Sequence, residues 1–372
     1  MRKYDNTFGL ISGNDYYEND EYIWMCLAWG NAICRVSKKS GRAEVVSQYP
    51  NTACGKHNLS GSIQVVDDQV VFCPFSADYI AICNMIGRNV RYIKLKKKFA
   101  VSGVNYSSDG KFFNSFRFGR YVYLFGWTYP AIVEINMDTL NVNYIDEWVE
   151  EVVRKKGFEP SNSYFNEGGA IIDERVYLPM GCLSALFSFD LNRRKGEIIE
   201  IKETEGGFWG LTRCGANMWL TGVNGGIYKY DIENRKIDSL EAPINVSYRA
   251  PVVCNNNKLF FFAEGTKSFF YDADRGEWEE SNRINNIIHS GNFLTTVKYE
   301  KNLLKFVTKR TREWYSFHME QKLVEKETYF LEDDDFLQKC WKSRCEDVNR
   351  KMYFVNEREI GLDEFISCLT NS

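Results

Sequence analysis

The chain has 372 residues, of which 44% are apolar and 15% aromatic. Its formal net charge is −3 and its pI is about 5.9, so the chain as a whole does not attract a phosphate backbone, and we expect no nucleic-acid partner. The length exceeds that of an ordinary single core, which indicates either several domains or one repetitive architecture.

The N-terminal segment is polar. Asp15, Glu18, Asp20 and Glu21 follow the start without an apolar stretch, which is not the pattern of a secretory signal. No run approaches the roughly 20 apolar residues that a spanning helix needs, so we expect no membrane span. The 11 cysteines are odd in number, and several lie in apolar strand patterns. We interpret them as reduced thiols and expect a cytoplasmic protein.

One strand pattern recurs seven times from Tyr22 to about residue 330. Each copy has an apolar run, a turn, a second run that closes on an Asp, an Asn or a related residue, and a last short strand. The closing positions are Ser37, Asn84, Asn136, Asp190, Asp231, Asp272 and His318. A four-stranded unit repeated every 40 to 50 residues or so is typical of propellers. We therefore predict an all-β fold over residues 1–331, a seven-bladed β-propeller of four-stranded blades, with six blades as the alternative.

The closing Asp and Asn residues are interpreted as turn formers, because their side chains accept hydrogen bonds from backbone N–H groups two residues on. They are not predicted to be catalytic acids. Upstream of each copy lies another short strand, usually introduced by glycine, as at Gly61, Gly168 and Gly206. We assign it to the innermost strand of each blade, where small residues let neighbouring blades approach.

Two segments depart from the repeat. Between the third and fourth copies, residues 145–157 carry apolar side chains on one face of a predicted helix. This helix either covers a blade edge or forms part of a partner surface. Residues 332–372 predict a C-terminal helical extension, with Phe336, Leu337, Cys340 and Trp341 at helical spacing. We expect this extension to pack on the propeller, with homodimerisation or docking to another protein as the alternatives.

The segment from Tyr271 to Trp278 resembles the signature of kelch repeats, in which an aromatic–Asp pair is followed by a Trp seven positions after the aromatic residue. The pairs Gly168-Gly169 and Gly206-Gly207 resemble the kelch double glycine. This resemblance implies a propeller of the kelch-like or galactose-oxidase-central-domain-like type over most of residues 1–330. Kelch-like propellers serve as protein-binding modules, sugar-processing enzymes and enzyme scaffolds, so the function must be argued from the site.

Motifs of known catalytic and metal sites are missing from the sequence. The chain has three histidines and no HExxH, GxSxG, P-loop or CxxC motif. Cys340 and Cys345 lie five apart on the predicted helix with no nearby His, so we expect no zinc site, and no cofactor is predicted. The basic run Lys94–Lys98 is interpreted as the charged side chains by which an outer strand blocks edge pairing.

The connections into the innermost strands meet at one face of a propeller, around the mouth of its channel. Here they carry His57, Asn58, Ser60, Asn114, Arg117, Asn166, Glu167, Trp209, Tyr248, Arg249, His289 and Asn292. Amides and Arg form hydrogen bonds and an aromatic ring stacks, so we expect a carbohydrate or another small polar ligand, or a peptide end, to bind there. Glu167 and the histidines could supply a general acid and base. The competing interpretation is that these residues satisfy backbone groups and ordered waters.

Three functional hypotheses follow. The first is a non-catalytic binding or scaffold propeller that recognises a protein or peptide through the mouth of the channel and the C-terminal helices. The second is a sugar- or small-metabolite-processing enzyme that uses His57, His289, Glu167 and Arg249. The third is an architectural subunit of a larger assembly.

Overall fold

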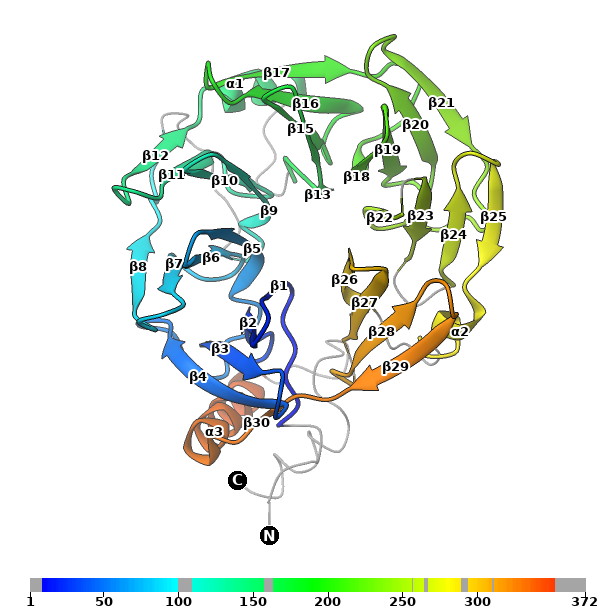
Figure 1. The fold of residues 1–372 in the computed structure, drawn as a ribbon. Helices are drawn as coiled ribbons and strands as arrows, with labels where there is room; N and C mark the ends of the chain where they lie inside the picture. The colour runs from blue at the N-terminus through cyan, green and yellow to red at the C-terminus, as the bar shows by residue number, and fades with distance from the viewer. Residues whose placement is uncertain are drawn as a thin grey trace.

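Seven sheets surround one axis and form the blades of a ring (Figure 1). The computed structural model describes residues 9–99, 109–156, 163–255, 257–263, 267–288, 294–309 and 311–351. Each blade has four antiparallel strands that follow one another from the axis outward, and two blades carry a fifth strand. The predicted seven-bladed β-propeller is confirmed, and the alternative with six blades is wrong.

The first four blades follow the order of the chain. Blade 1 contains β1 (Tyr16–Glu18), β2 (Tyr22–Cys26), β3 (Ala32–Ser37) and β4 (Arg42–Gln48). Blade 2 contains β5 (Ser60–Val66), β6 (Gln69–Pro74), β7 (Tyr79–Asn84) and β8 (Val90–Lys94). Blade 3 contains β9 (Phe112–Phe118), β10 (Tyr121–Gly126), β11 (Ile132–Asn136) and β12 (Val142–Ile145). Blade 4 contains β14 (Ala170–Ile172), β15 (Arg175–Pro179), β16 (Ala185–Asp190) and β17 (Lys195–Glu200).

The remaining blades complete the ring. Blade 5 contains β18 (Phe208–Cys214), β19 (Asn217–Gly222), β20 (Ile227–Asp231) and β21 (Lys236–Leu240), with β13 (Glu167–Gly168) added at its inner edge. Blade 6 contains β22 (Val252–Cys254), β23 (Lys258–Phe261), β24 (Phe269–Asp272) and β25 (Glu277–Glu280). Blade 7 contains β26 (Leu294–Glu300), β27 (Leu303–Thr308), β28 (Trp314–His318) and β29 (Leu323–Glu327). The helices are α1 (Trp148–Lys156), α2 (Asn282–Asn285) and α3 (Asp334–Lys351), and β30 (Phe330–Leu331) precedes α3.

The hydrophobic core lies between the blades. The second and third strands of a blade are nearly continuous buried runs, as in β6 and β7, because both faces of each sheet are covered by neighbouring blades. The outermost strands are more polar and more exposed, as in β17. Helix α1 lies within the predicted segment 145–157, and its Trp148 packs on Phe165 and Phe187 with ring centroids 4.7 and 5.5 Å apart.

The turns between the third and fourth strands form as the sequence predicts. The side-chain Oδ1 of Asn84, Asn136, Asp190 and Asp272 accepts hydrogen bonds from backbone N–H groups two and three residues on. Each side chain thereby replaces a backbone partner at the start of a hairpin. These carboxylates and amides are therefore structural.

The ring closes at blade 1. Strand β30 pairs in parallel with β4, which makes it the fifth and outermost strand of this blade. The backbone N–H of Ile11 donates to Tyr329 at 3.1 Å, and that of Leu331 donates to Gly9 at 2.9 Å. Segments from the two ends of the described chain therefore pair with each other and with one blade (Figure 1).

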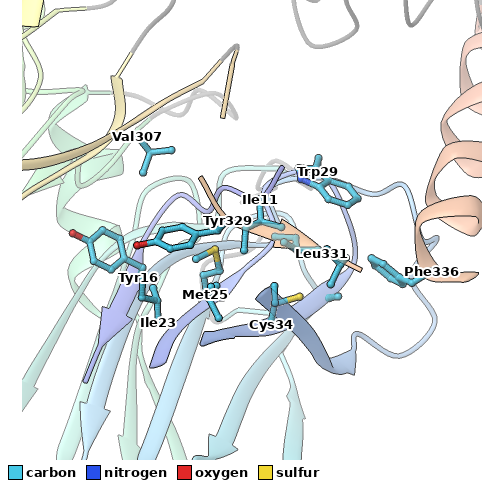
Figure 2. Close-up of a cluster of buried hydrophobic side chains, with 14 of the residues drawn as sticks. Ile11, Tyr16, Ile23, Met25, Trp29, Cys34, Val307, Tyr329, Leu331 and Phe336 are labelled. Carbon is cyan, nitrogen blue, oxygen red and sulfur yellow. The ribbon is translucent and has the colours of Figure 1, made fainter. Parts of the chain in front are cut away.

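A hydrophobic cluster accompanies this closure (Figure 2). Ile11 from the N-terminal segment, Met25 from blade 1 and Val307 from blade 7 lie in one buried cluster with Leu331 and with Phe336 of α3. Helix α3 continues this packing over blade 1, because the thiol of Cys340 lies 3.1 Å from the carbonyl oxygen of Cys54. The buried side of α3 is thus covered by the propeller.

Ionic contacts join blades 7 and 1. The ammonium of Lys305 in β27 lies 2.5 Å from one carboxylate oxygen of Glu18, and the ammonium of Lys38 lies 2.6 Å from the other. Burial by itself raises the pKa of Glu18, but the hydrogen bonds from Lys305 and Lys38 outweigh burial and hold the pKa below its ordinary value. The ionised form of Glu18 is therefore favoured by folding.

We predict that Glu18→Gln lowers the free energy of unfolding at pH 7 by about 1–3 kcal/mol, because it removes two charge-assisted hydrogen bonds. A depressed pKa stabilises the fold above the unfolded value, about 4.3, and this stabilisation is lost as the pH falls through the folded pKa. The deficit of the variant should therefore shrink between about pH 5 and pH 3. Urea unfolding of the wild-type chain and of Glu18→Gln across this pH range measures the difference in their free energies of unfolding. Glu21→Gln, at an exposed position, is the control. An equal deficit at every pH would show that charge is not the cause.

Candidate functional site

The innermost strands give one equivalent residue per blade. They end at residues 18, 66, 118, 172, 214, 254 and 300. Five positions before these ends lie Gly13, Gly61, Phe113, Glu167, Trp209, Arg249 and Thr295, which we call the axial ring. Equal spacing from the strand ends makes these residues corresponding positions of the repeat. They lie on the face at which the innermost strands begin, which we call the entry face.

Backbone bulges set the positions of the axial ring. In blades 2, 3, 5 and 7 the pairing between the first and second strands skips one residue, and that residue is Gly61, Phe113, Trp209 or Thr295. A bulged residue is released from the alternation of the strand, so the side chains of Phe113 and Trp209 can take a new direction. The same irregularity in four blades therefore supplies four of the seven positions.

The axial ring is not uniform. A Cβ atom on Gly61 would lie 2.3 Å from the carbonyl oxygen of Phe112, and one on Gly13 would lie 2.9 Å from that of Cys26. Neighbouring backbone thus forces glycine in blades 1 and 2. Of the larger side chains, Phe113 comes from blade 3, Glu167 and Trp209 come from the sheet of blade 5, and Arg249 comes from the connection into blade 6.

An ion pair crosses this part of the ring. Nε of Arg249 lies 2.5 Å from one carboxylate oxygen of Glu167, and Nη2 donates to the other at 2.9 Å. The two side chains are 17% and 28% exposed, so the pair is partly shielded but reachable from solvent. The guanidinium lies 5.9 Å from the ring centroid of Trp209, within the range of a cation–π contact. The sequence prediction of Glu167, Trp209 and Arg249 thus identifies three side chains that the structure brings together.

A break between β13 and β14 places Glu167 beside Arg249. Strand β13 pairs in parallel with β18 of blade 5, and the chain then turns into β14 of blade 4. Gly168 has φ +80° and Gly169 has φ +154°, and a Cβ on Gly168 would lie 2.1 Å from the carbonyl oxygen of Leu211. The double glycine noted in the sequence therefore permits the change of blade.

Two buried asparagines hold the ring residues in place. Asn166 accepts a hydrogen bond from Nε1 of Trp127 at 2.9 Å and donates to the carbonyl of Phe208 at 2.8 Å. Asn114 donates to the carbonyl of Asn166 and accepts from the backbone N–H of Gly168 at 2.9 Å. Both side chains are almost fully buried. These two candidates are therefore positioning residues, as the competing structural interpretation expects.

Three aromatic side chains that sequence reasoning missed lie on the entry face. The rings of Phe75 and Trp127 are 5.8 Å apart and nearly parallel, and Phe113 lies 5.0 and 4.7 Å from them. All three are partly exposed, and we call them the aromatic shelf. Phe75 and Trp127 directly follow the second strands of blades 2 and 3. The connections after the second strands reach the same face as the connections into the innermost strands. The position of Phe75 and Trp127 directly after second strands is therefore the sequence signal that could have identified them.

The other predicted residues lie elsewhere. Arg117 lies at the far end of β9, where it is exposed and donates to the carbonyl of Val65 at 3.0 Å, so its placement at the entry face is wrong. Tyr248 is fully buried, its hydroxyl donates to Ile244 at 3.2 Å, and burial raises its pKa to about 12, so it belongs to the core. The carbonyls of His57 and Asn58 accept from the Ser76 hydroxyl at 2.8 and 2.9 Å, and Ser60 is buried. His289 and Asn292 lie outside the described residues.

Two clefts lie away from the axial ring. One of about 550 Å³ is formed by Glu203, Glu205, Asn224, Tyr228 and Asn245 beside blade 5. The other, of about 430 Å³, runs along β17 towards Tyr230 and shares Glu203 with the first. Among the described residues, no three His, Cys, Asp or Glu side chains are close enough to hold a metal ion. In the same part of the chain, no helix has both the length and the apolar character for crossing a bilayer.

No family model and no curated protein matches the chain. Solved structures do match, among them a catalytically inactive histidine-to-alanine variant of virginiamycin B lyase from Staphylococcus aureus with quinupristin, at 12% identity and a TM-score of 0.61, covering 84% of this chain and 95% of that one. A streptogramin B lyase matches at 12% identity and a TM-score of 0.56, covering 86% and 93%.

The WD40 repeats of RRP9 match at 10% identity with a TM-score of 0.53, covering 74% of this chain and 82% of that one. An enzyme and a WD40 domain thus resemble the chain to a similar degree. At these identities the likeness shows the propeller fold and nothing finer. The function must be argued from the entry face.

We predict that Asn166→Ala lowers the free energy of unfolding by about 2–4 kcal/mol, because Trp127 Nε1 and the Phe208 carbonyl both lose a buried partner. The tryptophan emission of the native state should also change, since the indole of Trp127 loses its anchor. Urea unfolding followed by fluorescence tests both points, and Asn141→Ala on an exposed turn is the matched control. Unfolding midpoints that are equal for the two variants would contradict the positioning role.

Proposed function

We propose that the chain is a non-catalytic binding propeller that recognises a protein or peptide partner through its entry face. The observation that carries this proposal is the gathering of partly exposed aromatic side chains and one arginine on that face: the aromatic shelf, Trp209 and Arg249. Aromatic residues and Arg are enriched at the centres of protein interfaces, where they supply most of the binding energy.

The chemistry of the ion pair favours binding over catalysis. Both carboxylate oxygens of Glu167 accept from Arg249, and the backbone N–H of Ala250 adds a contact at 3.4 Å. A general base needs a free lone pair directed at the substrate proton. In this arrangement Glu167 orients Arg249, and Arg249 and Trp209 present the contact surface.

Three finer points belong to the same proposal. A kelch-like lineage is supported by the contact between Tyr271 and Trp278, which pair across β24 and β25 with ring centroids 4.7 Å apart.

A cytoplasmic location is supported by the nine described cysteines, none of which forms a disulfide. The boundary between propeller and extension, at residues 331 and 332, falls between β30 and α3.

A sugar is the second candidate ligand. Partly exposed aromatic faces beside a planar, bidentate Glu–Arg pair also match the stacking and hydrogen-bonding needs of a carbohydrate ring. A panel of labelled glycans, titrated against the wild-type chain by fluorescence anisotropy, tests this candidate. If glycans bind and no peptide is selected, a carbohydrate ligand replaces the protein or peptide partner in the proposal.

We predict that Phe113→Ala/Trp127→Ala lowers the affinity for peptides selected on the wild-type chain by about 10- to 100-fold. Aromatic side chains that a bound peptide covers are each worth around 1–2 kcal/mol or more. The peptides come from selection of a random displayed library, and fluorescence anisotropy measures their affinities. Ile86→Ala/Leu323→Ala removes two exposed apolar side chains, one in the turn after β7 and one at the start of β29, and is the control. Circular dichroism of each variant checks the fold, and Trp127→Phe should restore part of the affinity.

Equal affinity for the shelf variant and the control variant would exclude the entry face as the binding surface. A failure to select any peptide or glycan with the wild-type chain would argue against recognition by this face altogether.

A further inference from the structure

A basic segment lies beside the aromatic shelf. Strand β8 ends at Lys94, so only this lysine belongs to the outer edge of blade 2. Lys96, Lys97 and Lys98 follow it outside the sheet and are exposed. Because the first and fourth strands of a blade run in opposite directions, the end of β8 lies on the entry face. The interpretation of this run as edge protection therefore holds for Lys94 alone.

The backbone of this segment is held in place. Leu95 is buried, and its N–H donates to the carbonyl of Asp78 at 2.9 Å. The N–H of Lys96 donates to the hydroxyl of Tyr144 at 3.1 Å, and the hydroxyl of Tyr129 donates to the carbonyl of Lys96 at 2.7 Å. The backbone at the start of the lysine run is therefore fixed at Leu95 and Lys96, which lowers the conformational entropy that binding would cost there.

Further lysines join the segment to the aromatic shelf. The ammonium groups of Lys97 and Lys111 lie 3.7 and 3.5 Å from the two carboxylate oxygens of Asp78, so they share one counter-ion. The Lys111 side chain is buried, and its backbone N–H donates to the carbonyl of Phe75 at 2.8 Å while its carbonyl accepts from the N–H of Trp127 at 2.7 Å, which joins its segment to the backbone of two shelf residues. The connection before β5 adds Lys56, which lies 3.2 Å from Asp109.

The charges of this patch do not balance. Among the described residues it contains Lys56, Lys96, Lys97, Lys98 and Lys111, and the carboxylates that pair with them are Asp78 and Asp109. Lys96, Lys97 and Lys98 place three exposed ammonium groups in one run, beside the carboxylate of Asp78 that Lys97 shares with the buried Lys111, so this run carries an excess of positive charge on a chain whose net charge is −3. The excess is thus a local property of the rim of blades 2 and 3, beside an aromatic surface.

We propose that the partner presents an acidic peptide segment with an aromatic residue, whose ring contacts the aromatic shelf while its carboxylates lie along Lys96–Lys98. This inference rests on the proposed function and names the chemistry of the partner. Opposite charges at a preformed patch accelerate association and exclude wrong partners. A single-stranded nucleic acid could use the same features, but a long phosphate backbone would extend over an acidic molecule and past Asp78 and Asp109, so the short acidic segment is favoured.

The test uses the full chain and two synthetic fluorescein-labelled peptides, one of glutamates interrupted by two phenylalanines and one with glutamine in place of every glutamate. Lys96→Gln/Lys97→Gln/Lys98→Gln is compared with Lys39→Gln/Lys195→Gln/Lys236→Gln. The control removes the same charge from one third-to-fourth strand turn, at Lys39, and from the first residues of two fourth strands, Lys195 and Lys236, all on the face opposite to the entry face. Anisotropy titrations at low and at physiological salt give the affinities.

We expect the glutamate peptide to bind the wild-type chain and the control variant alike, and the patch variant about 10-fold more weakly, since several surface charges of modest worth are removed together. Its affinity should fall with salt, and the glutamine peptide should bind weakly to all three proteins. Equal losses in both triple variants, or equal binding of the two peptides, would overturn the proposal.

A labelled oligothymidylate that binds more tightly than the glutamate peptide would overturn it in favour of nucleic acid. The peptides selected from the random library separate this inference from the function on which it rests. If they lose affinity in Phe113→Ala/Trp127→Ala but not in the patch variant, recognition by the entry face stands and the acidic partner is wrong.

Discussion

Everything in this molecule depends on giving each blade two neighbours. A sheet with two apolar faces is stable only when both are covered, so the first and last blades must meet. Here they meet through the pairing of residues 9–11 with residues 329–331 and of β30 with β4. The buried cluster around Ile11, Met25 and Leu331 then fills the joint, and α3 extends it (Figure 2).

The repeat made the fold predictable, because the turns that separate its strands have local causes. Asn84, Asn136, Asp190 and Asp272 start turns through their own side chains, so the number and spacing of the blades can be counted in the sequence. Closure is different. It is made by short segments, such as β30, whose partners lie almost a full chain length away, and no local pattern marks such pairs.

The candidate site was predictable in part for the same reason. Glu167, Trp209 and Arg249 lie at equivalent places in the repeat and were found together. Phe113 was missed by one residue, since the bulge that releases it has no signature in the sequence, and its neighbour Asn114 proved to be buried. Arg117 was assigned to the wrong face because the length of β9 was not known. Phe75 and Trp127 were missed because only one of the two sets of connections on that face was considered.

Blades related by approximate rotation would offer a ligand several equivalent orientations about the axis. The axial ring removes that equivalence: backbone contacts impose glycine at residues 13 and 61, whereas residues 113, 167, 209 and 249 supply an aromatic, an acid, a second aromatic and a base in fixed order. No rotation of the ring onto itself reproduces that order. A molecule seated on the entry face therefore meets a surface with a single direction, and the propeller can select how its ligand is turned as well as which ligand it holds.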